Sequence, residues 1–301
     1  MKALVTGATG YVGSKLCARL LAEGWQVEVI TRAAARPLPE PLAGKVHLHA
    51  YDGSTQSLMD AVATSAPDLV FHLASLFIAE HRSEQVTDLI NSNVLFGTQL
   101  IEACARTGVK RFINTGTSWQ HYRSDAYDPV CLYAATKQAF EDILDFYVDA
   151  FGIDVITLKL FDTYGPDDPR PKLVNLLLKA LRTGEAIGMS PGEQLLDLVH
   201  IDDVTRAFAV SAQHLLDGRS PPSHKHYAVS TGKPISVRQL VALLEQVGGK
   251  ALKVTFGARP YREREVMRPW RAGQQLPHWR AEFDLPSGLT SMVRMLEPHE
   301  T

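Results

Sequence analysis

Near its start the chain reads Lys2-Ala3-Leu4-Val5-Thr6-Gly7-Ala8-Thr9-Gly10-Tyr11-Val12-Gly13. The apolar run predicts a strand, and the apolar periodicity of residues 11–22 predicts a helix after it. Between them, Gly7 allows a tight turn, Gly10 lets the backbone approach a pyrophosphate, and Gly13 lets the helix pack close to the sheet. Because a helix N-terminus offers free N–H groups and a positive dipole end, the loop predicts a nucleotide-binding site. The residues expected to contact the nucleotide there are Gly7, Thr9, Gly10, Tyr11, Val12 and Gly13.

After this loop, short apolar runs alternate with segments of helical periodicity. Strands are expected at residues 27–30, 46–50, 69–73, 112–114 and 155–160, and helices at residues 84–106 and 132–151. Such alternation implies parallel strands joined by right-handed crossovers, and short apolar runs suit a sheet covered on both faces. We therefore predict an α/β fold, a doubly wound parallel Rossmann sheet with a smaller mixed α/β C-terminal substrate lobe.

The alternation loosens after residue 160. Proline and glycine cluster at residues 165–171, and prolines again at residues 220–222, which predicts loops; further helices are expected near residues 237–246 and 287–296. We expect a Rossmann domain over residues 1–160, joined by about residues 200–230, which return to it. Residues 161–199 and 231–301 would form the substrate lobe.

Composition excludes several classes of function. The 301 residues are 45% hydrophobic and 21% charged, with a net charge of -2, so neither nucleic acid nor an anionic membrane is an expected partner. The longest apolar stretch, residues 69–79, is far shorter than the roughly 20 residues of a membrane span. Cys17, Cys104 and Cys131 lack metal or disulfide spacing. With no apolar leader before the first strand, we expect a cytoplasmic protein without a metal.

The end of the second predicted strand bears on the choice of cofactor. An acidic residue there would hold the ribose 2′-hydroxyl of NAD, whereas this chain has Thr31-Arg32, with Arg36 nearby. A guanidinium suits a 2′-phosphate, so we predict NADP(H), the alternative being a solvated surface arginine. Asp52, followed by Gly53, could accept a hydrogen bond from the adenine amino group or simply cap a loop.

Tyr133 and Lys137 are four residues apart in the predicted helix of residues 132–151 and therefore share one face. An ammonium beside a phenol favours the phenolate and lowers its pKa from about 10. Such a tyrosine can pass a proton to or from a carbonyl or hydroxyl oxygen. The pair therefore predicts an acid–base site.

In chain order these features resemble the extended short-chain dehydrogenase/reductase family, which includes nucleotide-sugar epimerases, dehydratases and ketoreductases. The resemblance covers nearly the whole chain. The matching segments are the glycine loop, His72-Leu73-Ala74, Asn93-Val94-x-x-Gly97-Thr98, Thr115-Gly116-Thr117, Tyr133 with Lys137, Tyr164-Gly165-Pro166 and residues 197–204 (DLVHIDDV). Residues 115–121 (TGTSWQH) and 132–142 (LYAATKQAFED) are most similar to the CDP-abequose synthase-like nucleotide-sugar 4-ketoreductases.

The resemblance implies roles for the matching residues. Thr117 would hydrogen-bond the substrate oxygen and Tyr133 would be the general acid/base. Lys137 would bind the nicotinamide ribose and lower the pKa of Tyr133. Asn93 corresponds to a helix position near the cofactor, or else bonds the backbone. Two further cofactor contacts are expected at Leu73 and Ala74, whereas the neighbouring His72 is better explained as a hydrogen-bonded histidine at a strand end.

The residues after Thr117 narrow the reaction. Family 4,6-dehydratases have Asp-Glu there, and family decarboxylases usually keep an acidic residue nearby. Ser118-Trp119 cannot act as carboxylic acids, so ketone reduction and epimerisation remain. Family epimerases retain NAD, whereas a reductase consumes NADPH. Arg32 therefore favours NADPH-dependent reduction of a nucleotide-linked 4-keto-6-deoxy sugar to the alcohol.

The C-terminal lobe is expected to bind the nucleotide diphosphate. Arg262 corresponds to a family arginine that binds phosphate, for which a bidentate guanidinium is suited. Arg264 is the second candidate, and a salt-bridged surface run is the alternative. We expect residues 119–121 to face the sugar, with core or surface roles left open. The other expected substrate contacts are Ser75, Thr117, Ser118, Trp119 and, as weaker candidates, Lys172 and Asn175.

Other functions remain open from sequence alone. They are a nucleotide-sugar epimerase with tightly held NAD, a non-catalytic NADP-binding regulator, and a reductase of a non-sugar carbonyl. The presence of Tyr133 and Lys137 with Thr117 argues against the regulator. Because the family commonly dimerises through the helices before and after the catalytic strand, here residues 84–106 and 132–151, we expect a homodimer.

Overall fold

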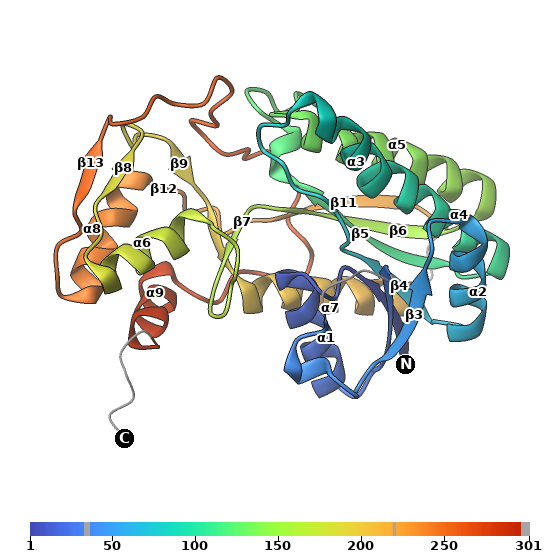
Figure 1. The fold of residues 1–301 in the computed structure, drawn as a ribbon. Coiled ribbons are helices and arrows are strands. Elements are labelled where there is room, and N and C mark those ends of the chain that lie inside the picture. Colours follow the sequence, from blue (N-terminus) through green and yellow to red (C-terminus); the bar gives the residue numbers. More distant parts are fainter. Residues whose placement is uncertain (33–36, 219–220, 296–301) are drawn as a thin grey trace.

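A computed structural model describes residues 1–32, 37–218 and 221–295, and Figure 1 shows their arrangement. Seven strands pair in parallel throughout to form one sheet. In spatial order they are β11 (His224–Val229), β6 (Asp154–Leu160), β5 (Arg111–Thr117), β4 (Leu69–His72), β1 (Lys2–Thr6), β2 (Gln26–Arg32) and β3 (His47–Tyr51). The predicted doubly wound parallel sheet is confirmed.

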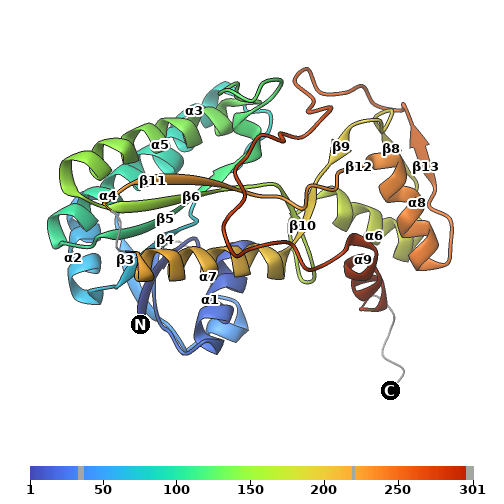
Figure 2. The same cartoon turned by 180° about the vertical axis from the view of Figure 1, so that it is seen from behind.

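Helices cover both faces of the sheet (Figures 1 and 2). One face carries α1 (Tyr11–Ala22) and α7 (Ile201–Asp217); the other carries α2 (Thr55–Ser65), α4 (Phe96–Thr107) and α5 (Leu132–Phe151). The predicted bounds of α1 and α5 are confirmed. The single helix predicted over residues 84–106 is wrong in one respect. The structure has α3 (Val86–Ile90), a π-helical turn (Asn91–Leu95) and then α4.

The apolar sequence pattern accounts for the packing of these layers. On one face Leu16 and Leu20 of α1 are fully buried in a cluster that includes Phe208 of α7. On the other, Leu100 of α4 and Leu144 of α5 are fully buried in a second cluster. Burying each such side chain contributes about 1.5–3 kcal/mol, which holds the helices, and the residues at their first turns, against the sheet.

The smaller C-terminal part lies beside the carboxyl ends of the strands (Figure 1). A third apolar cluster joins its helices. The helices are α6 (Leu173–Thr183), α8 (Val237–Gly248) and α9 (Leu285–Arg294). The strands form three pairs, β7 (Asp162–Tyr164) with β10 (Leu198–His200), β9 (Leu195–Leu196) with β12 (Ile235–Ser236), and β8 (Ile187–Met189) with β13 (Val254–Phe256). Arg36, Ser220 and Leu296, which sequence reasoning placed in the cofactor site, a loop and a helix, lie outside the described residues.

Buried carboxylates tie the two parts together within residues 197–204. Asp197 accepts hydrogen bonds from the backbone and hydroxyl of Thr231 at 3.0 and 2.6 Å. Asp203, in α7, accepts from the backbone N–H groups of Glu282 and Phe283 at 3.0 Å each. These contacts hold the C-terminal segment against the sheet domain. In the described part of the chain, every helix is too short or too polar to span a bilayer.

Candidate active site

The glycine loop between β1 and α1 is shaped by close backbone approach. Gly7 has φ of +80°, and a Cβ there would lie 2.7 Å from the backbone nitrogen of Ala74. A Cβ at Gly13 would overlap the carbonyl oxygen of Gly7. Gly10 is the N-cap of α1 and provides no side-chain cap, so the first N–H groups of the helix stay available to a ligand. This backbone cradle fits a pyrophosphate.

Thr6 and His72 close the floor of this loop. The Thr6 hydroxyl oxygen accepts from the backbone N–H groups of Leu73 and Ala74, both at 3.2 Å, and lies 2.9 Å from Nδ1 of His72. Burial lowers the pKa of His72 to about 3, so the ring is neutral. The expectation of a hydrogen-bonded histidine at a strand end is confirmed. Leu73 and Ala74 lie directly against Gly7, where a cofactor would meet the sheet.

Tyr11, predicted to contact the cofactor, also has a role within the fold. Its hydroxyl donates to the carbonyl oxygen of Pro166 at 3.0 Å, and the guanidinium of Arg170 lies 4.8 Å from its ring centre. These contacts connect the glycine loop to residues 165–170. Thr9 and Val12 lie beside Tyr11 on the loop and on α1, and the side chain of Lys15 pairs with Asp167 at 2.9 Å.

The strand ends beside the loop carry the other predicted cofactor contacts. Thr31 and the exposed Arg32 complete β2, whose last residues bring no carboxylate to this edge. Asp52 accepts from the backbone and hydroxyl of Ser54 at 2.8 and 2.7 Å, and these bonds lower the pKa of the Asp52 carboxyl. In the protein alone Asp52 thus has the loop-capping role that was its alternative. Gly53, next in the loop, has φ of +106°.

Tyr133 and Lys137 lie in the first two turns of α5 and are both buried, with the ammonium 5.9 Å from the phenol ring centre. Burial raises the pKa of Tyr133 to about 12, against a smaller lowering by Ser75. Burial also lowers the pKa of Lys137 to about 8. The expected depression of the tyrosine pKa is therefore wrong for the protein alone, because the loss of solvation outweighs the nearby cation.

Thr117, at the end of β5, is held by a buried network behind it. Its backbone N–H donates to Oε1 of Gln120 at 3.0 Å, and Nε2 of Gln120 donates to Glu141 of α5 at 3.0 Å. His121 lies 3.1 Å from the ammonium of Lys159 and stacks on Trp270. The expectation that Gln120 and His121 face the sugar is therefore wrong. Their polar groups are used to fix the strand end and α5.

Asn93, in the π-helical turn, bonds the segment that follows β4. Its amide donates to the carbonyl oxygen of Leu76 and to the hydroxyl of Thr136, both at 3.0 Å, and accepts from the N–H of Leu76 at 2.7 Å. Asn93 therefore bonds the backbone, which was the alternative to a position beside the cofactor. The contact fixes the segment that carries Ser75 and Phe77 beside Tyr133; the Phe77 ring lies 5.0 Å from that of Tyr133.

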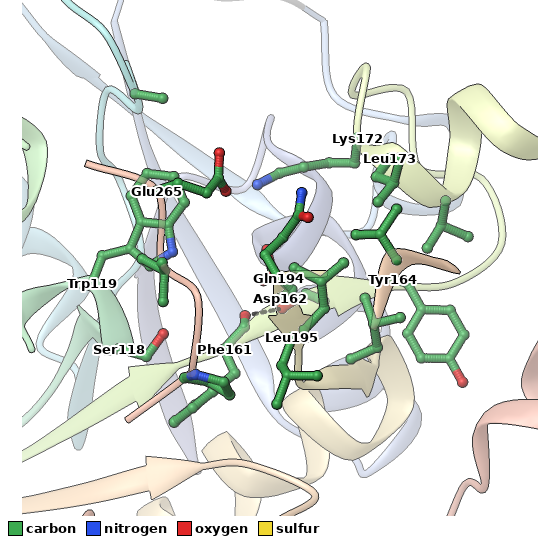
Figure 3. Close-up of a pocket in the computed structure, with 18 of the residues that line it drawn as sticks. Ser118, Trp119, Phe161, Asp162, Tyr164, Lys172, Leu173, Gln194, Leu195 and Glu265 are labelled. Atoms are coloured by element: carbon green, nitrogen blue, oxygen red, sulfur yellow. Dashed lines mark hydrogen bonds between the residues drawn. The ribbon is translucent and has the colours of Figure 1, made fainter. Parts of the chain in front are cut away.

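A pocket of about 270 Å³ opens between the strand ends and the C-terminal part (Figure 3). Five predicted substrate residues line it, namely Ser118, Trp119, Lys172, Asn175 and Arg262. Ser75 and Thr117 are not among its lining residues, although Phe77 connects the pocket to Tyr133. The amide of Asn175 donates to the carbonyl oxygens of Asp168 and Arg170, so it also shapes the wall.

The two candidate arginines lie in different environments. Arg262 pairs with Glu265 at 2.9 Å and lies 5.2 Å from the Trp119 ring, inside the pocket. Arg264 instead bonds the carbonyl oxygens of Pro129 and Val130, at 2.7 and 3.0 Å, and therefore holds the chain before α5. Arg262, the first candidate, therefore lines the pocket, and Arg264, the second, does not.

Sequence reasoning missed several pocket residues, among them Phe77, Asp162 and Glu265, whereas Lys172 was a weaker candidate. Asp162 follows β6, and burial raises its pKa while Lys172 and Arg262 oppose that change. Glu265 and Lys172 extend toward one another in Figure 3, and Lys172 lies 4.5 Å from the Phe77 ring. Asp162 begins β7, two residues after β6 ends, and this position was a signal available in the sequence, because ligands bind beyond the carboxyl ends of parallel strands. Glu265 and Phe77 reach the pocket only through tertiary packing.

Comparisons with known proteins agree with this geometry. Residues 3–229 match the model of the NAD dependent epimerase/dehydratase family. The chain is 26% identical to CDP-abequose synthase from Salmonella typhimurium over 88% of this chain and 87% of the relative. It is 28% identical to UDP-glucose 4-epimerase from Mycolicibacterium smegmatis over 80% of each.

A solved structure has a similar fold. The Thermus thermophilus UDP-glucose 4-epimerase in complex with NAD superposes with a TM-score of 0.80 at 25% identity, covering 99% of this chain and all of that one. The family match thus extends through the glycine loop, Tyr133, Lys137 and the last strand of the sheet.

Proposed function

The chain belongs to the NAD dependent epimerase/dehydratase family, and from that premise we propose that it reduces a nucleotide-linked 4-keto-6-deoxy sugar to the alcohol with NADPH. In support, the glycine loop follows β1 and Thr117 ends β5, at the carboxyl ends of the strands where doubly wound folds bind ligands. In this proposal residues 1–160 form the cofactor domain, to which about residues 200–230 return. Residues 161–199 and 231–301 form the substrate lobe.

The observation that carries the choice of NADPH is Arg32. It is an exposed guanidinium at the carboxyl end of β2, on an edge to which the strand brings no carboxylate. Guanidinium groups bind phosphates through paired hydrogen bonds, so Arg32 with Thr31 suits a 2′-phosphate. The backbone cradle at Gly7, Gly10 and Gly13 suits the pyrophosphate of the same cofactor. A reductase draws NADPH from the pool, so this edge supports reduction over epimerisation.

The pocket wall after β5 supports reduction over dehydration. Ser118 and Trp119 line the pocket and neither offers a carboxylic acid. Eliminating water from the sugar requires an acid and a base of suitable pKa beside the reacting carbons. The pocket carboxylates Asp162 and Glu265 come from other segments, and Glu265 is paired with Arg262.

The chemistry assigned to the chain is proton transfer and orientation. A bound NADPH would supply the hydride. Tyr133 would donate its phenolic proton to the carbonyl oxygen that becomes the alcohol, and its raised pKa keeps that proton in place in the protein alone. Thr117 would hydrogen-bond the same oxygen. Lys137 would bind the ribose of the cofactor and, when charged, favour the phenolate left on Tyr133.

The pocket supports a phosphate-bearing substrate. Arg262 and Lys172 are the cations among its lining residues. We propose that Arg262 exchanges its contact with Glu265 for the substrate diphosphate, while Ser75, Ser118, Trp119 and Asn175 contact the sugar side. The 26% identity to a CDP-abequose synthase supports a nucleotide sugar, without choosing the base.

The test is NADPH oxidation with 4-keto-6-deoxy sugars on CDP, dTDP, GDP and UDP, each generated in situ, with NADH in parallel. We expect turnover with NADPH on one nucleotide. Arg32→Ala should raise KM for NADPH about 10- to 150-fold, since a charged hydrogen bond is worth about 1.5–3 kcal/mol, and leave KM for NADH unchanged. Protein that binds NADPH yet oxidises it with none of the four sugars would contradict the proposal.

A second candidate is a nucleotide-sugar epimerase, favoured by the 28% identity to a UDP-glucose 4-epimerase. An epimerase recycles its cofactor and would keep NAD through purification. Release of NAD from the denatured pure protein, with interconversion of UDP-sugars and no net NADPH consumption, would establish it instead.

We also propose a homodimer through the helices on either side of β5. Exposed apolar side chains mark these helices, with Ile90 41%, Leu95 44% and Phe146 59% exposed. Sedimentation of the pure chain tests this, and Phe146→Glu should shift it to the monomer.

A further inference from the structure

Two histidines of β11 and a carboxylate of α5 form a cluster outside the active site. His224 and His226 are two residues apart on the edge strand, so their side chains leave the same face of the sheet. That face carries α5, from which Asp145 approaches. Ligand atoms of Asp145, His224 and His226 all lie within 4.8 Å of one another. The closest pair is Nδ1 of His224 and a carboxylate oxygen of Asp145, at 2.6 Å.

A buried carboxylate of α5 holds the second histidine. Oε2 of Glu141 forms an ion pair with Nδ1 of His226 at 3.4 Å, and both atoms are buried. Glu141 is 1% exposed, and it lies on the same face of α5 as Asp145, one turn earlier. Lys159 balances its charge from 3.5 Å away. The carboxylate of Glu141 therefore fixes the imidazole of His226 from the buried side, as carboxylates commonly do for histidines that bind metals.

The second nitrogen of His224 is already positioned as metal sites require. Its Nε2 lies 2.7 Å from the hydroxyl of Thr157 in β6. A metal-bound histidine usually places its other ring nitrogen against such a group, which fixes the ring and the tautomer. The buried His224 is thus rigid, whereas Asp145, with a 62% exposed side chain, can adjust.

We propose that Asp145, His224 and His226 bind a first-row transition-metal ion, with Zn²⁺ as the natural occupant. Two imidazoles and a carboxylate match the ligand preferences of Zn²⁺, and water would complete the tetrahedron. Ligand atoms in such a site are roughly 3.3 Å apart, given bonds of about 2.0 Å. A small outward movement of Asp145 and a turn of His226 produce that spacing. Glu141 orients His226 from the buried side.

The site joins the edge strand to α5 and is separate from the reaction. Asp145 is twelve residues after Tyr133 in α5, about 18 Å along the helix. The ion would therefore stabilise the packing of β11 against α5 without touching substrate or cofactor. The proposal does not depend on the proposed function, and its readouts are binding and stability.

The test uses the full chain without an affinity tag, freed of metal by chelation. We expect calorimetry to find one Zn²⁺ per chain, and Co²⁺ to give the intense visible absorption of a four-coordinate site. His226→Ala should weaken Zn²⁺ binding at least about tenfold, and Asp145→Asn, at an exposed position, provides a second variant that keeps the fold. His214→Ala is the matched control, because His214 faces His278 at 5.7 Å outside the cluster.

In the unaltered chain Zn²⁺ should raise the melting temperature, and it should not do so in His226→Ala. The proposal is overturned if no Zn²⁺ binds at one per chain, or if binding persists unchanged in both His226→Ala and Asp145→Asn while His214→Ala weakens it.

Discussion

The glycine loop and the substrate pocket lie at the same end of the sheet but are built in different ways. The loop is one consecutive segment, residues 6–13, and its shape comes from backbone contacts such as that of Gly7 with Ala74. The pocket gathers side chains from segments far apart in the chain, around residues 77, 118, 162, 172, 194 and 262. A site made of backbone is encoded locally, whereas a site made of side chains depends on the whole fold.

The two regions also differ in their charged side chains. Residues 6–13 carry no charged side chain, so the loop would bind phosphate through N–H groups and a helix dipole. The pocket contains Lys172 and Arg262 together with Asp162 and Glu265. Charge pairs can be rearranged by a ligand, so specificity is expected to come from the pocket and affinity for the cofactor from the loop.

The largest effect is expected from a substitution at Tyr133. It should slow the chemical step and leave the binding of the cofactor unchanged. Tyr133→Phe removes the proton donor but keeps the ring against Phe77, 5.0 Å away. General acid catalysis is worth about 10²–10⁴-fold, so kcat should fall by that factor while the Kd for NADPH stays unchanged. Steady-state kinetics and fluorescence titration measure the two. Tyr127→Phe, at an exposed tyrosine, is the control, and a kcat within a few-fold of the parent would show that Tyr133 is not the acid.

Sequence alone predicted six of the seven strands of the sheet, the loop and the helix that carries Tyr133 and Lys137, because each rests on local pattern. The edge strand β11 was not predicted. Apolar runs and glycine spacing indicated β1, Gly7 and α1, and the bounds of α5 were predicted to the residue. The π-helical turn around Asn93 was not predictable, since it depends on contacts with Leu76 and Thr136.

The pocket was only partly predictable for the same reason. Ser118, Trp119 and Arg262 were found through family spacing, but Gln120 and His121 were wrongly placed there. Their partners, Glu141 and Lys159, come from α5 and β6, and no local pattern reveals that they meet. Asp52 likewise turned out to cap its own loop.

The next effect tests whether backbone shape alone makes the loop. Gly13→Ala adds a methyl group that would overlap the carbonyl oxygen of Gly7. Relieving such an overlap costs about 1–3 kcal/mol, so NADPH should bind about 5- to 150-fold more weakly. Titration of the pure protein with NADPH measures this. Lys15→Ala, on the same helix, removes only a surface ion pair and should change little. Unchanged affinity in Gly13→Ala would mean that the loop is not shaped by this contact.

A smaller effect is expected in the pocket, on the binding of the sugar nucleotide and not on that of NADPH. Arg262→Ala removes the cation 5.2 Å from the Trp119 ring and proposed to bind the substrate diphosphate. One charged hydrogen bond of about 1.5 kcal/mol predicts a roughly tenfold higher KM for the sugar nucleotide, with the Kd for NADPH unchanged. Arg268→Ala, an exposed arginine six residues later, is the matched control. Equal effects of the two substitutions would remove Arg262 from the substrate site.

The smallest effect concerns the pH dependence of stability, and it should come from one buried side chain, Lys137. Burial lowers the pKa of Lys137 to about 8 in the folded chain, from an ordinary value of 10.5. Between these values the unfolded chain holds a proton that the folded chain has released, so stability rises with pH in this window. From pH 7.5 to 9 the gain is about 1 kcal/mol. Urea unfolding of the unaltered chain and of Lys137→Met measures it as a difference. The methionine variant keeps the buried volume without the charge, so its stability should lack this rise. An equal rise in both proteins would assign the effect to another group and leave Lys137 charged in the folded state across this range.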